Sequence, residues 1–163
     1  MRRTLKFGGV AVMAVTAIMG GSQVASASSP CEPVRAVIID AGTTTNCNSP
    51  NDFCAAGTVR GNAGLNGTTY YTMDGGVHGP ANAPTYIMAT GILVYTTRSG
   101  TMTVRETGVS NAAPTADSGT TASVEDIISG TGRFKHASGH LFINGNAANG
   151  QFVSQVSGQI CRS

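Results

Sequence analysis

Residues 123–161 read SVEDIISGTGRFKHASGHLFINGNAANGQFVSQVSGQIC, and their pattern gives the first indication of the fold class. Three short runs of alternating apolar and polar residues are separated by turns rich in Gly and Asn. This pattern is typical of an antiparallel meander. Gly130, Gly132 and Gly139 suit a bulged strand end and a tight return, because glycine adopts positive φ without strain from a Cβ atom. Phe134 lies between these glycines and is the expected core anchor.

Similar runs precede this stretch, so we expect eight strands in all. Eight short antiparallel strands can close into a small barrel, which leaves no exposed sheet edge. An all-β, eight-stranded antiparallel barrel without substantial helix is therefore the expected fold, and an open two-sheet sandwich is the alternative. Long loops are expected over residues 41–55, 74–84 and 111–119. The expected strands cover residues 34–40, 57–63, 67–73, 85–97, 101–109, 120–128, 139–146 and 151–160.

The first 27 residues have the pattern of a signal peptide. Arg2, Arg3 and Lys6 form a positive start, and residues 10–19 are an apolar run too short to span a membrane. Ala25-Ser26-Ala27 supplies small residues for cleavage, so the mature chain is expected to start at Ser28. We therefore expect a secreted, extracellular protein of microbial export type, without a membrane anchor.

The expected mature chain, residues 28–163, is long enough for one domain with its own core. Without the three basic residues of the leader it has seven basic and eight acidic residues, a net charge of −1. No basic patch interleaved with aromatic residues remains, which argues against a nucleic-acid partner. We also expect no cofactor. His136 and His140 are four residues apart, but their strand context does not place both rings on one face, so no metal site is expected.

All four cysteines lie in the expected mature chain. An even number in an exported chain favours two disulfides, and four cysteines allow three connectivities. Cys47 and Cys54 flank a turn-rich loop that can close on itself, and Cys31 and Cys161 would then join the two ends of the domain. We therefore predict the pairs Cys47–Cys54 and Cys31–Cys161.

The alternation of two neighbouring strands suggests acidic groups inside the barrel. In residues 101–109, Glu106 shares a face with Met102 and Val104. In residues 120–128, Asp126 shares a face with Val124, whereas Ser123, Glu125 and Ile127 form the opposite face. A carboxyl group in an apolar lumen has a raised pKa, which suits a general acid or base. Glu106 and Asp126 are therefore the candidate catalytic residues, although a partner arginine or a bulge that reverses the alternation would remove that role.

The same faces supply three of the candidate ligand-binding residues, Met102, Val104 and Val124, and the fourth is Tyr86. Tyr86 belongs to residues 85–97, the most apolar strand, which is apolar on both faces. A strand of this kind needs cover outside the barrel, either from a loop or from another subunit.

Parts of the chain resemble a known family. The runs G-T-G-R-F (residues 130–134), A-S-G (137–139) and V-S-G-Q-I-C (156–161) look like the allene oxide cyclase and dirigent β-barrel superfamily, most of all its secreted microbial members. The run T-R-S-G-T-M-T (97–103) resembles the strand-turn-strand of that family. The resemblance covers roughly residues 58–161. It implies an allene oxide cyclase-like, calycin-like barrel and allows a homo-oligomer, a trimer or a dimer, but none of the plant cyclases' catalytic residues can be placed on this chain.

Two classes of function follow from these expectations. In the first, the barrel binds a small, mostly apolar molecule and directs an intramolecular cyclisation or a stereoselective coupling, as a cyclase or isomerase or as a dirigent-like auxiliary. In the second, the protein is a non-catalytic extracellular binding or structural module whose barrel is filled by side chains. Whether the lumen is open and contains an acid separates the two classes.

Overall fold

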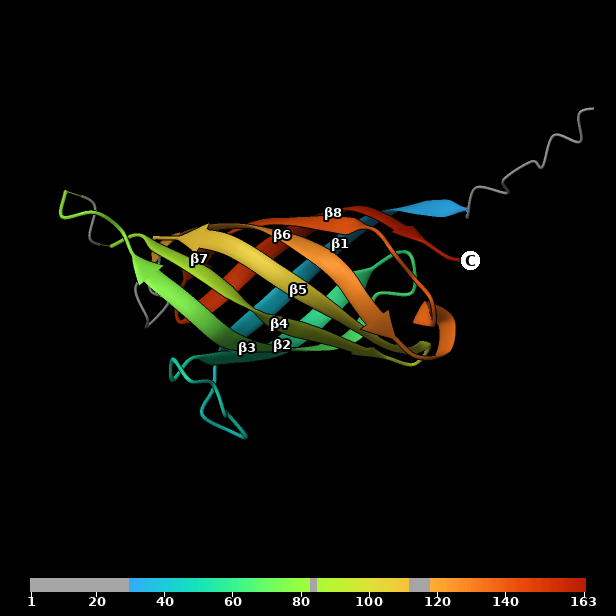
Figure 1. Cartoon of the computed structure of the whole chain (residues 1–163), viewed down its shortest axis with the longest axis horizontal. Coiled ribbons are helices and arrows are strands. Elements are labelled where there is room, and N and C mark those ends of the chain that lie inside the picture. The colour runs from blue at the N-terminus through green and yellow to red at the C-terminus, as the bar shows by residue number, and fades with distance from the viewer. Residues whose placement is uncertain (1–29, 83–84, 112–117) are drawn as a thin grey trace, which may run out of the picture.

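The computed structural model describes residues 30–82, 85–111 and 118–163, which form a closed antiparallel barrel of eight strands (Figure 1). Each strand pairs with the next one in the sequence, and β8 pairs with β1 to close the sheet. The predicted fold is confirmed, and the sandwich alternative is wrong. The elements are β1 (Cys31–Gly42), β2 (Cys54–Gly61), β3 (Asn66–His78), β4 (Ile87–Thr97), β5 (Gly100–Ser110), β6 (Ser118–Gly130), the 3-10 helix η1 (Gly132–Phe134), β7 (His140–Ala148) and β8 (Gln151–Cys161).

The predicted leader, residues 1–27, lies outside the described residues. Across the described ranges, no helix has the length and hydrophobicity that a membrane crossing requires.

One predicted loop begins as strand. Residues 74–84 are rich in Gly and Pro, which favoured a loop, but β3 continues to His78 and pairs with β4 along this length. The register shifts between Met73 and Gly75, so a bulge at Asp74 lets the strand bend and carry on. Gly75 and Gly76 face Thr90 and Ala89 of β4. The extended part of β3 forms one wall of the lumen, next to the start of β4.

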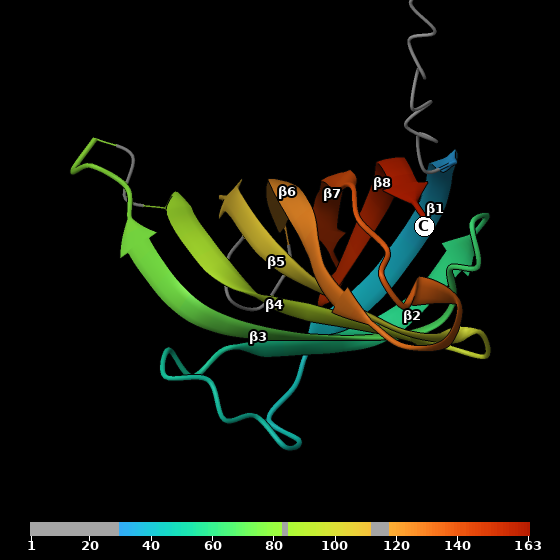
Figure 2. The same ribbon diagram turned by 45° about the vertical axis from the view of Figure 1, so that its right-hand side comes forward.

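Both predicted disulfides are present. Cys31 and Cys161 are direct partners in the β1–β8 ladder, and their disulfide joins the strands that close the barrel. The Cys47–Cys54 disulfide closes the connection between β1 and β2, residues 43–53, which projects from the barrel in Figure 2. Both predicted pairs, one across a short loop and one between the two ends of the domain, are therefore confirmed.

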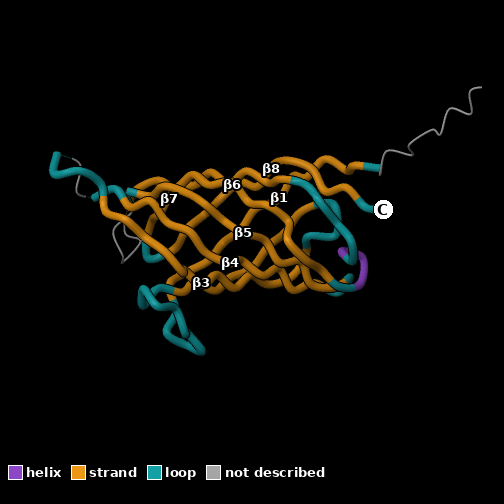
Figure 3. Tube along the Cα trace, in the orientation of Figure 1, coloured by secondary structure: helices purple, strands orange, loops and turns teal. Residues whose placement is uncertain are grey.

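Phe134 closes one end of the barrel. The 3-10 helix that carries it lies at this end, beside the end of β8 (Figure 3). Phe134 is fully buried, and the guanidinium of Arg162 lies 5.7 Å from the centre of its ring. Gly132 has φ of 55° and packs so closely on Ser99 that a Cβ atom would lie 2.3 Å from the Ser99 carbonyl oxygen. This turn therefore needs glycine, as the sequence suggested, and Phe134 is confirmed as a core anchor.

The hydrophobic core fills the half of the barrel next to η1. Strand alternation sends every second side chain inward, and in this half those side chains are large and apolar. The fully buried members are Val59, Leu65, Tyr95, Met102, Val104, Phe134, Leu141 and Ile160. The other half, toward the ends of β1 and β3 and the starts of β4 and β8, is not filled in this way.

Candidate functional site

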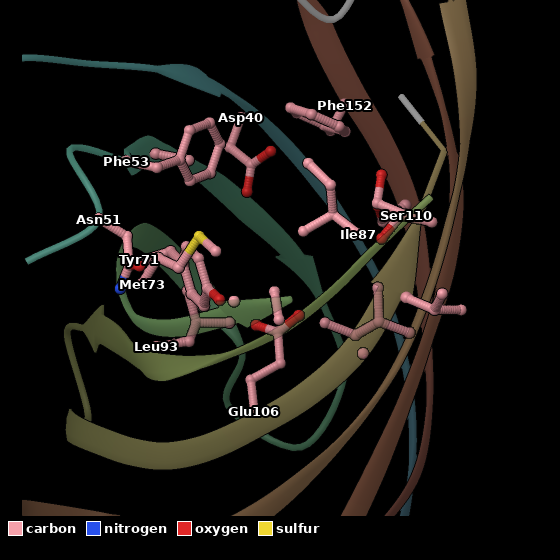
Figure 4. A pocket seen from close by; sticks show the side chains of 18 of the residues that line it. Asp40, Asn51, Phe53, Tyr71, Met73, Ile87, Leu93, Glu106, Ser110 and Phe152 are labelled. Atoms are coloured by element: carbon pink, nitrogen blue, oxygen red, sulfur yellow. The ribbon is translucent and has the colours of Figure 1, made fainter. Parts of the chain in front are cut away.

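A cavity of about 410 Å³ occupies the half of the barrel away from η1. Its volume lies within the range of small-molecule sites, roughly 300–1,000 Å³. Figure 4 shows side chains from several strands and from the β1–β2 connection pointing into the same space. The apolar lining residues include Ile38, Phe53, Met73, Ile87, Leu93, Ile143 and Phe152.

Glu106 points into this cavity from β5, as predicted. Its ladder partners are Gly91 on β4 and Glu125 on β6. A Cβ atom on Gly91 would lie 2.5 Å from a ring atom of Tyr71, so glycine makes room for the tyrosine ring next to the carboxyl group. Burial raises the pKa of Glu106, and the nearby Ser123 side chain partly opposes this by favouring the charged form. Glu106 is thus an acidic group on the wall of an apolar cavity.

A second acid, Asp40, lines the cavity from β1. Its ladder partners are Gly57 and Phe152, and Gly57 is so close that a Cβ atom there would lie 2.4 Å from the Asp40 Cβ. Burial, and secondly the charge of Glu106, raises the pKa of Asp40 to about 7. Asp40 therefore changes charge near neutral pH, whereas an ordinary aspartate does so near 3.9.

The sequence analysis did not select Asp40, although a signal was present. Val34, Ala36, Ile38 and Asp40 alternate along β1, and the first three are buried in the lumen. The same alternation that selected Glu106 on β5 also points the Asp40 side chain inward.

A third acid, Glu125, is the ladder partner of Glu106 on β6 and is fully buried. The Tyr95 hydroxyl oxygen lies 2.9 Å from Oε1 and 2.8 Å from Oε2 of Glu125. Burial, and secondly the charge of Glu106, raises the pKa of Glu125 well above its usual range. Burial therefore favours the neutral form of this group, in which one oxygen can accept a hydrogen bond from Tyr95 while the protonated one donates to it.

The prediction that Asp126 and Val124 face the lumen is wrong. Both lie on the outer surface, where Asp126 pairs with His140 and Val124 is 43% exposed. The alternation method takes the more apolar face as buried, but along β6 the inward face is the polar one, with Ser123 and Glu125. A bulge opposite Thr103 and Val104, which leaves Ile128 as the extra residue, also reverses the phase at the end of β6. Two inward carboxyl groups on neighbouring strands do exist, but the partner of Glu106 is Glu125.

None of the predicted ligand-binding residues lines the cavity. Met102 and Val104 point inward as predicted, but both are fully buried in the packed half of the barrel. Tyr86 lies just before β4 and is 44% exposed. Strand alternation predicts which side chains point inward, but it does not predict which half of the lumen is filled by side chains.

The apolar sequence of β4 predicted that its outward side chains are covered, but these side chains are only partly buried. Ile92 and Val94 on the outer face are half-buried, whereas Met88 is 56% exposed. The inward face is the one with Leu93 and Tyr95, which are buried in the lumen, and it is opposite to the face of Tyr86.

The chemistry that this arrangement allows is acid and base chemistry in an apolar space. Asp40 can donate or accept a proton near neutral pH, because its pKa is raised to about 7, and burial shifts the pKa of Glu106 in the same direction. Tyr71 stays a neutral hydrogen-bond donor, since burial raises the pKa of its phenol. Within residues 30–82, 85–111 and 118–163, no three His, Cys, Asp or Glu side chains are grouped to hold a metal ion.

The fold and the cavity together define a class of protein, the closed eight-stranded antiparallel barrels with a lumen open in one half. Comparison of the chain with family models, with curated proteins and with solved structures gives no match. The cavity and its acids are therefore the basis for assigning a function.

Proposed function

We propose that this protein is an exported barrel that binds a small, mostly apolar molecule in the open half of its lumen. One observation carries the proposal: a cavity of about 410 Å³ lies where a filled barrel would have core side chains. Its walls are mainly apolar, with a few polar groups that can orient a ligand, as in most small-molecule sites. Two disulfides are compatible with an oxidising, extracellular compartment, and the leader-like residues 1–27 support export.

A guided reaction of the bound molecule is the second candidate. It is favoured by the position of Glu106 on the cavity wall, where a carboxyl group can stabilise developing positive charge or move a proton. The resemblance to allene oxide cyclases and dirigent proteins supports an intramolecular cyclisation or a stereoselective coupling. Catalysis would require Glu106 or Asp40 to act on the bound molecule, whereas binding alone would not. Homo-oligomer formation also stays a prediction, supported by the exposed apolar side chains of Val124 and Phe142.

Filling the cavity should abolish binding. Ala89 lines the cavity from β4, so Ala89→Phe places a phenyl ring in the space that a ligand needs. We expect the uncharged fluorescent probe N-phenyl-1-naphthylamine to bind one site per wild-type barrel. Its affinity for Ala89→Phe should be weaker by about tenfold or more, equivalent to about 1.4 kcal/mol.

The matched control is Ala122→Phe, which adds the same ring on the exposed outer face of β6. This variant should bind the probe like the wild type, as followed by fluorescence titration. Equal affinity of the wild type and Ala89→Phe, or no binding by the wild type, would contradict the proposed site.

A further inference from the structure

The charges around the cavity are acidic. Asp40, Asp52 and Glu106 line it, together with His78. Among the described residues that line the cavity there is no lysine or arginine. An anionic ligand would therefore meet carboxyl groups without any fixed positive charge.

Among the residues that the structure describes, Asp40 and Glu106 also lack a positive partner. No ion pair formed by the described residues includes Asp40 or Glu106. Arg105, which directly precedes Glu106 in the sequence, points out of the barrel and pairs with Asp74. The other arginines in ion pairs, Arg133 and Arg162, bind Glu32 in the neighbourhood of the closed end.

Unpaired carboxyl groups on a cavity wall are an unusual arrangement. Burying an ionised carboxylate without a counter-charge is strongly unfavourable. Glu106 is largely buried and aims into an empty volume rather than into packed side chains (Figure 4). A cation that enters this volume would supply the missing partner, and the apolar walls would hold the rest of the ligand.

We infer that the ligand of this cavity is an apolar molecule that carries a protonated amine, with the ammonium group lying between Asp40 and Glu106. The inference rests on the proposed function and adds the chemical class of the ligand. An ammonium group within about 4–6 Å of a buried carboxyl group stabilises its charged form. The hydrocarbon part of the ligand would lie against Leu93, Ile87 and Phe152.

Amine binding should be coupled to the loss of a proton from the cavity. Asp40 is partly protonated near neutral pH, and a bound cation would favour its ionised form. Binding should therefore strengthen from about pH 5 to about pH 8, a range in which an alkylamine stays protonated. The titratable groups that line the cavity are Asp40 on β1, Asp52 in the β1–β2 connection, Tyr71 and His78 on β3 and Glu106 on β5. Tyr95 on β4 and Glu125 on β6 do not line it, but both are buried and interact electrostatically with Glu106.

Three probes of equal chain length test the inference. Octylamine, 1-octanol and octanoate are each titrated against the wild-type protein with bound N-phenyl-1-naphthylamine, and displacement is followed by fluorescence. At about pH 8, octylamine should bind at least about tenfold more tightly than 1-octanol, and octanoate should bind most weakly. The preference for the amine should shrink toward about pH 5, and calorimetry in two buffers should show proton release near pH 7.

Variants test whether the preference for the amine depends on Asp40 and Glu106. In Asp40→Asn/Glu106→Gln the affinity ratio of octylamine to 1-octanol should fall close to one. The single change Asp40→Asn should lower the same ratio if the double variant does not fold. Asp126→Asn removes an acid from the outer face and should keep the wild-type ratio.

The outcomes separate this inference from the proposed function. If 1-octanol binds as tightly as octylamine at about pH 8, the amine class is wrong while the lumen remains a binding site. If octanoate is preferred, the acidic character of the site is overturned. If none of the three probes displaces the fluorescent probe and that probe itself does not bind, both proposals fail together.

Discussion

Raising the pH from about 4 to about 7 is expected to lower the free energy of unfolding by up to about 4 kcal/mol through Asp40 alone. Burial raises the pKa of Asp40 from 3.8 to about 7 in the folded protein. Between these pH values the folded state holds a proton that the unfolded state has released. Stability therefore falls as the pH rises through this window and levels off above it. Burial also raises the pKa of Glu106 and of Glu125, so both acids add to the effect in the same direction.

Asp40→Asn should remove the Asp40 part of this pH dependence, because asparagine is neutral at every pH. Urea unfolding at several pH values between about 4 and 8 measures it. Asp126→Asn, on the outer face, should retain the decline seen in the wild type. An Asp40→Asn variant whose stability falls with pH as steeply as that of the wild type would show that this carboxyl group is not the buried acid described here.

Replacing Cys31 and Cys161 with serine is expected to lower the free energy of unfolding by about 5 kcal/mol in the chain-entropy model. The disulfide connects residues 130 apart in the sequence and joins the two strands that close the barrel. Without this disulfide, the unfolded chain gains conformational entropy, because a loop of nearly the whole domain is no longer closed. The loss should be greater than most single core substitutions cause.

The second disulfide provides the matched comparison. Cys47 and Cys54 are only seven residues apart, so replacing this pair should lower stability by about 2 kcal/mol in the same model. Thermal and urea unfolding of both double variants give the two values. Equal losses, or a larger loss for the short loop, would contradict the view that the long bridge stabilises the closed barrel.

Much of the fold could be predicted from the sequence because its signals are local. Alternating runs and glycine turns gave the strands, and the even number of cysteines in the expected mature chain gave the disulfides. Phe134 was recognised because glycines flank it on both sides in a turn that has no room for Cβ atoms. The continuation of β3 through Gly75 and Gly76 was missed, because composition alone does not distinguish a bulged strand from a loop.

The site was harder to predict because it depends on the barrel as a whole. Glu106 was found from the alternation along its own strand. Glu125 and Asp126 were assigned to the wrong faces, since the inward side of β6 is more polar than the outward side. Met102 and Val104 were assigned to a binding site, but side chains from distant turns, among them Phe134 and Leu65, fill that half of the lumen.

The most direct test of the central claim is to locate a bound apolar probe by NMR. With methyl-labelled protein and 1-octanol, intermolecular NOEs should reach the cavity methyls and not those of the packed half or the outer surface. We expect contacts to Ile38, Ile87, Leu93 and Ile143. Contacts instead to Val34, Val104 and Leu141 in the packed half, or to Val124 and Val153 on the outer surface, would contradict it.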